Sequence, residues 1–111
     1  MVRDKKQAVV DEKLLDSIPL KSRLLYVIQQ GGEMWTDEAT DKLLADAGMK
    51  RTNRWLWVIR FYLMELSVNG MLKVLDEKVA DESYYGRPDV VITKYVITSF
   101  GVERLNDVLG V

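Results

Sequence analysis

The chain has 111 residues, a length at which a single domain is expected. Its 16 Lys and Arg residues nearly balance its 17 Asp and Glu residues, and it contains neither histidine nor cysteine. The missing residue types exclude a disulfide framework, a thiolate zinc site and an imidazole general base. We therefore expect a protein that is not an enzyme and uses no metal or other cofactor.

The first segment, 1–18, is predicted to be a charged N-terminal extension with a short helix. The helical pattern is carried by four apolar residues: Val9, Val10, Leu14 and Leu15. No apolar segment follows the N-terminal charges, so a signal peptide is not expected. The longest apolar-rich run, 55–64, is too short to cross a membrane and contains Arg60. These features predict a cytoplasmic protein without a membrane partner.

Pro19 is expected to begin the main domain, which we assign to 19–98, because proline fits the first turn of a helix. Apolar residues then recur at helical spacing as far as Gly31 and Gly32, a pair typical of a helix end. The segment 33–35 is too short for a helix and is predicted to be a brief strand.

Two further helices are predicted in the middle of the chain. Thr36 is the expected N-cap of a short acidic helix that ends at Gly48. Thr52 or Asn53 is the expected N-cap of a third, longer helix that ends at Gly70.

After the third helix the hydrophobic period changes from about 3.6 to 2, which indicates strands. Residues 71–79 and 90–97 are predicted to be two strands joined by a loop at 80–89. Thr98 is expected to cap a last helix within the segment 99–111.

Two sequence motifs resemble those of a known family. The run LSVNGML at 66–72 is similar to the L-x-x-x-G-x-I/L step from a recognition helix into a wing strand. The run YVITSFGVERL at 95–105 is similar to the Y-x-L-T-x-x-G-x-x-x-L junction that follows the wing. Over about 20–109 the chain resembles winged helix-turn-helix transcription regulators of the PadR and MarR kind from archaea and bacteria. The resemblance implies an α+β fold, mostly α, with a three-helix core, a β-hairpin wing and helices at both ends.

The charges are separated along the chain. Segment 33–49 carries five acids and one lysine, a net of -4, whereas segment 50–60 carries four cations and no acid, a net of +4. The resemblance implies that the start of the third helix contacts double-stranded DNA. The residues expected at this contact are Lys50, Arg51, Thr52, Asn53 and Arg54. Arginine can read guanine and asparagine can read adenine. The alternative is a solvated helix start with scattered cations.

The predicted wing offers Lys78 and Arg87 as further DNA contacts. The same loop carries three acids that would repel phosphates: Asp81, Glu82 and Asp89. Gly86 and Pro88 are expected to shape the tip. We expect Tyr84 and Tyr85 to pack back on the hairpin rather than to stack on bases.

The third helix is unusually apolar, with ten apolar residues among the thirteen from 54 to 66. The expected core stripe consists of Leu56, Ile59, Leu63 and Leu66. Trp57, Val58 and Phe61 then fall near the opposite face, which must be covered by the terminal segments or by a second chain. We expect a homodimer whose interface contains Leu14, Leu15, Trp57, Phe61, Leu105 and Leu109. The alternative is a monomer whose terminal helices cover its own core.

The function predicted from these observations is that of a sequence-specific DNA-binding transcription regulator, with the third helix in the major groove. The alternative is a winged-helix protein–protein interaction module, or an assembly subunit, without direct DNA binding. The acidic pI of about 5.5 and the apolar outer side of the third helix favour this alternative.

Overall fold

A computed structural model describes residues 10–111, and Val9 with the rest of segment 1–9 lies outside the described residues. The helices are α1 (Glu12–Ser17), α2 (Leu20–Gly31), α3 (Thr36–Asp46), α4 (Asn53–Val68), α5 (Glu82–Tyr85) and α6 (Ser99–Leu109). The strands are β1 (Met34–Trp35), β2 (Leu72–Val79) and β3 (Val91–Ile97). The fold is therefore α+β and mostly helical, as expected. Among the helices of the described part, none is long and apolar enough to cross a membrane.

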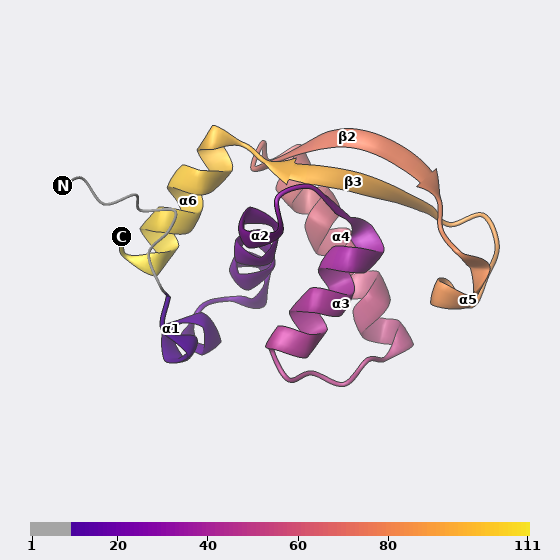
Figure 1. Ribbon diagram of the computed structural model, residues 1–111, viewed down its shortest axis with the longest axis horizontal. Helices are drawn as coiled ribbons and strands as arrows, with labels where there is room; N and C mark the ends of the chain where they lie inside the picture. Colours follow the sequence, from indigo (N-terminus) through magenta and orange to yellow (C-terminus); the bar gives the residue numbers. More distant parts are fainter. Residues whose placement is uncertain (1–9) are drawn as a thin grey trace.

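The three strands form an antiparallel sheet in the order β1-β3-β2 (Figure 1). The long hairpin pairs Leu72 with Ile97 at one end and Val79 with Val91 at the other, with a bulge at Leu75. This sheet extends over one end of the helices α2, α3 and α4, which lie below it in Figure 1.

The role of Thr36 differs from the prediction. Trp35 occupies the N-cap position of α3, and the Glu38 carboxylate accepts a hydrogen bond from its N–H at 2.9 Å. The buried Thr36 hydroxyl instead accepts the Thr93 N–H at 3.0 Å and donates to the Thr93 carbonyl at 3.2 Å. Thr36 is therefore not a cap, because its hydroxyl extends the short β1–β3 pairing by one position.

The inner side of α4 forms the centre of the core. The predicted stripe is confirmed, since all four side chains are buried: Leu56, Ile59, Leu63 and Leu66. They pack with the apolar sides of α2 and α3, which include Leu24, Ile28 and Leu43. The fully buried members of this cluster come from all three helices, so the three helices share one core.

The terminal helices pack onto α2 rather than onto the outer side of α4. α1 is held by the buried Arg23 of α2, whose guanidinium pairs with Asp16 and Glu12 and donates to the Asp46 carbonyl at 2.7 Å. α6 packs against α2 (Figure 1). Three residues expected at a dimer interface are buried in the chain's own core: Leu15, Leu105 and Leu109. They have little surface left to offer a partner, and Leu14 is partly buried against the same core.

The segment predicted to be a plain loop contains the short helix α5. The Asp81 carboxylate accepts the Ser83 N–H at 2.9 Å and so caps the start of α5. Gly86 ends the helix with φ 72°, a conformation that glycine adopts without strain. The sequence contained both signals, but a four-residue helix is too short to produce a recognisable period.

Candidate nucleic-acid interface

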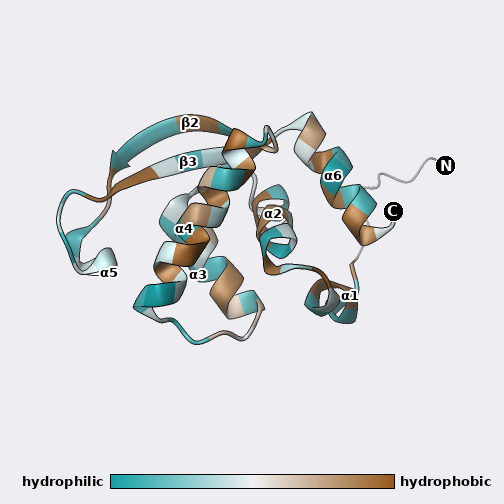
Figure 2. Ribbon diagram, turned by 180° about the vertical axis from the view of Figure 1, so that it is seen from behind, coloured by the Kyte–Doolittle hydropathy of each residue, from teal (hydrophilic) through white to brown (hydrophobic). Residues whose placement is uncertain are grey.

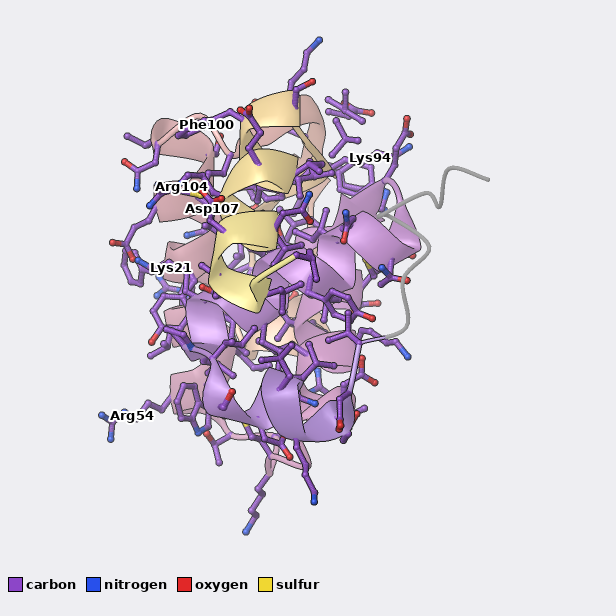
Figure 3. All side chains as sticks on the ribbon, turned by 90° about the vertical axis from the view of Figure 1, so that its left-hand side faces the viewer. Lys21, Arg54, Lys94, Phe100, Arg104 and Asp107 are labelled. Carbon is purple, nitrogen blue, oxygen red and sulfur yellow. The ribbon has the colours of Figure 1, made fainter. Side chains whose placement is uncertain are left out.

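The amino end of α4 presents polar and basic side chains to solvent. Thr52 is the N-cap, and its hydroxyl accepts the Trp55 N–H at 3.2 Å. Lys50, Asn53 and Arg54 are exposed, and the first turn of α4 contains no acidic residue. Arg54 projects away from the helices into solvent (Figure 3). This end of the helix therefore combines free cations with the positive end of the helix dipole, an arrangement that attracts phosphate.

Arg51 is held in place beside this end. Its guanidinium lies 4.5 Å from the ring centroid of Tyr84, and its Nε lies 3.9 Å from the Asp41 carboxylate. The side chain remains 54 % exposed. Arg51 thus keeps an open side toward solvent, although the Asp41 carboxylate offsets part of its charge.

The two tyrosines of α5 contact the helices α3 and α4. The Tyr84 hydroxyl donates to the Asp41 carboxylate at 2.9 Å, and the Tyr85 ring lies 5.0 Å from the Trp57 ring. These contacts with α3 and α4 are additional to the expected packing of the two tyrosines on the hairpin. As a result, α5 borders a shallow pocket that also contains Arg51, Thr52 and Asn53.

The two cations of the predicted wing lie in different places. Arg87 is exposed and shares a pocket with Trp57 and Arg60, so it lies next to the outer side of α4. Lys78 instead reaches across β3, and its ammonium lies 4.1 Å from the ring centroid of Trp35. The structure therefore groups Arg87 with α4 and holds Lys78 on the β1 side of the sheet.

The Tyr85 hydroxyl is buried and has no hydrogen-bond partner within the described residues. Burial raises the pKa of this hydroxyl from its ordinary value of 10.0 to about 12, and the nearby Arg60 guanidinium opposes the rise. Burial and the Asp41 carboxylate also raise the pKa of Tyr84. Both shifts favour the neutral phenol in the folded chain, so the docking of α5 is most stable below about pH 10.

This arrangement predicts the behaviour of Tyr85→Phe. The substitution removes an unpartnered buried hydroxyl, so at about pH 7 the free energy of unfolding should stay constant or rise by up to about 1 kcal/mol. The wild type should lose stability as the pH rises from 10 toward 12, because the unfolded state releases the phenol protons first. The variant should lose less over the same range. Urea unfolding at the two ends of the range measures both effects.

The matched control is Tyr62→Phe, which alters a partly exposed tyrosine of α4. It should leave the free energy of unfolding within about 0.5 kcal/mol of the wild type at about pH 7. A clear loss of stability in Tyr85→Phe at this pH would show that the hydroxyl has a partner and would contradict the prediction.

The outer side of α4 is apolar and exposed to solvent. Phe61 is 58 % exposed and Val68 is 86 % exposed, with Met64 between them, and Trp57 is covered only in part by Tyr85. Figure 2 looks onto this side, where α4 lies in front of α3 and below the β2–β3 hairpin. Within residues 10–111, the terminal helices α1 and α6 therefore do not cover the outer side of α4, because they pack against α2.

Sequence reasoning missed the contribution of α3 to this region. The Asp41 carboxylate accepts a hydrogen bond from the Tyr84 hydroxyl and faces Arg51, yet in the sequence Asp41 is only one of the five acids of segment 33–49. Tyr84 lies 43 positions further along the chain, and no local pattern connects residues at that separation.

No family model, curated protein or solved structure matches the chain, so the proposals for its function rest on the geometry described above.

Proposed function

We propose that the chain is a winged helix-turn-helix protein that binds double-stranded DNA and regulates transcription. Helices α3 and α4 with the turn at 47–52 correspond to the helix-turn-helix, and the β2–β3 hairpin corresponds to the wing. The element order α2–β1–α3–α4–β2–β3 and the strand order β1-β3-β2 are compatible with such a fold.

One observation carries the DNA proposal, namely the exposed basic start of α4. Lys50 and Arg54 have no ion-pair partner among residues 10–111 and can each neutralise a phosphate. Asn53 stands beside them and is of the right chemical type to read adenine in the major groove. Arg51 lies beside this start at the border with α5, and Arg87 lies further along α4, in the pocket that contains Trp57 and Arg60.

The experiment is a titration of the chain with a short random-sequence duplex at increasing salt, followed by fluorescence anisotropy. The double variant Lys50→Ala/Arg54→Ala should weaken binding to every duplex. The slope of log K against log salt should decrease by about one for each phosphate contact that is lost. If the wild type shows no salt-dependent binding to duplex DNA at low ionic strength, the proposal fails.

Arg104→Ala is the matched control. Arg104 is an exposed arginine of α6, and Figure 3 shows it well separated from Arg54. Its loss removes one positive charge, half of what the double variant removes, but should leave the salt slope unchanged. Equal effects of the two substitutions would mean that the binding responds to net charge alone.

A second candidate function is a winged-helix interaction module that does not contact DNA. The observation that favours it is the apolar outer side of α4, because a helix side read by DNA is usually polar. This candidate predicts that the duplex titration gives no signal, whereas substitutions at Phe61 break an assembly and leave the chain folded.

A further inference from the structure

We infer that the outer side of α4 and the hairpin binds a second copy of this chain in a two-fold symmetric dimer. The outer apolar face consists of Phe61, Met64, Val68, Val74, Val79 and Val91, all of which are at least 40 % exposed. This inference does not depend on DNA binding, because the face is defined by exposure and charge alone.

The six side chains form one continuous surface. Met64, Val68, Val74 and Val91 line a single groove of about 420 Å³ between α4 and the sheet. Phe61 precedes Met64 by one helical turn, and Val79 pairs with Val91 across the hairpin. Exposed apolar surface of this kind marks an interaction site in water-soluble proteins.

The edge of β2 is an unsuitable place for a partner, so the contact must involve the face. β2 is an edge strand, and such strands can add an extended peptide from another chain. The bulge at Leu75 interrupts its regular pairing, and the exposed Lys73 places a charge on it. Both devices oppose strand addition.

The charges at the groove favour a second copy over an unrelated partner. Arg60 of α4 and Glu77 of β2 line opposite walls, and neither forms an ion pair within residues 10–111. In a two-fold dimer, a contact from one residue to another occurs twice, once in each direction. Arg60 of each copy would then meet Glu77 of the other, while the apolar walls cover one another.

The rest of the chain does not oppose this pairing. The formal net charge is -1, so two copies repel each other only weakly. Arg54 lies on the same side of α4 as Phe61 and about two turns nearer the amino end, so a dimer that leaves Lys50 and Arg54 in solvent must be centred toward Val68.

The test is sedimentation equilibrium of the full chain without DNA, over a wide range of concentrations. The wild type should approach twice the 12.8 kDa mass of one chain as the concentration rises. Val68→Asp should weaken the dimer by at least about tenfold, because it places a charge at an apolar contact. Val108→Asp is the matched control, since Val108 is an exposed valine of α6 outside the face. It should leave the mass unchanged.

A charge exchange tests the proposed pairing of Arg60 with Glu77. Glu77→Arg should weaken the dimer by about tenfold, and the double variant Arg60→Glu/Glu77→Arg should regain most of the loss. Circular dichroism checks that each variant is folded, because Arg60 also donates to the Val91 carbonyl at 2.9 Å. Glu77 and Val68 are exposed and take no part in this hydrogen bond, so Glu77→Arg and Val68→Asp leave it in place.

Three results would overturn the inference. A wild type that stays monomeric at every concentration shows that no second copy binds. A dimer that survives Val68→Asp uses another surface. A folded double variant that does not recover shows that Arg60 and Glu77 do not pair. None of these results bears on the duplex titration, so the dimer and the DNA proposal can fail separately.

Discussion

Leu63→Ala is expected to lower the free energy of unfolding by about 2–5 kcal/mol. Leu63 is fully buried at the centre of α4, among side chains of α2 and α3 that belong to the same core. Alanine leaves a cavity that close-packed neighbours fill only in part, so the loss exceeds the transfer free energy of the missing atoms. Urea unfolding followed by circular dichroism measures the change.

Val68→Ala on the same helix is the matched control for this prediction. Val68 is 86 % exposed, and alanine is the better helix former. The free energy of unfolding should therefore change by less than about 0.5 kcal/mol. The comparison is made at the lowest workable concentration, where self-association contributes least. Equal losses at the two positions would contradict the assignment of an inner and an outer side to α4.

Gly101→Ala is expected to destabilise the chain by about 1–3 kcal/mol, although alanine is favoured over glycine in helices by about 1 kcal/mol. A Cβ atom at Gly101 would overlap the Met71 carbonyl oxygen and would lie 2.7 Å from the Ile97 Cγ1. The carbonyl belongs to the backbone and accepts the Thr98 N–H at 3.0 Å, so it cannot move aside without breaking that bond. The clash therefore outweighs the gain in helix propensity.

The measurement is again the urea midpoint, with Ser99→Ala as the control. Ser99 is the exposed first residue of α6, and its hydroxyl forms no hydrogen bond within residues 10–111, so its substitution should have an effect below about 0.5 kcal/mol. If Gly101→Ala proved as stable as the wild type, the close approach of α6 to Met71 would be wrong.

The junction around Gly101 also explains why two separate motifs occur in the sequence. The Thr98 hydroxyl accepts the Gly101 N–H at 3.0 Å and donates to the Gly70 carbonyl at 2.7 Å. One threonine thus caps α6 and ties it to the turn that follows α4. The runs at 66–72 and 95–105 are therefore parts of one contact in space.

Much of the fold could be predicted because its signals are local. Thr52 and Thr98 cap α4 and α6 as expected, and the change of period after Gly70 marks the start of the hairpin. The inner stripe of α4 follows from the helical period alone, since apolar residues three or four positions apart in a helix point to the same side.

The candidate site could be predicted only in part. The basic start of α4 is visible in the sequence because three of the five residues from 50 to 54 are cations and none is an acid. The partners of Arg51 are not, because Asp41 and Tyr84 come from two other elements. For the same reason Lys78 and Arg87 are equivalent in the sequence, whereas in the structure Lys78 lies over Trp35 of β1 and Arg87 lies in a pocket with Trp57 of α4.

The sequence by itself determined the order of the elements, the caps and the inner side of α4, because these depend on residues within a few positions of one another. Only the tertiary structure decided that Thr36 extends the sheet, that α5 docks on α3 and α4, and that the terminal helices leave Phe61 and Val68 exposed. These features depend on contacts between distant residues, such as Thr36 with Thr93 at a separation of 57 positions. The period of a helix shows which of its sides are apolar, but the packing of the other elements decides which side is covered.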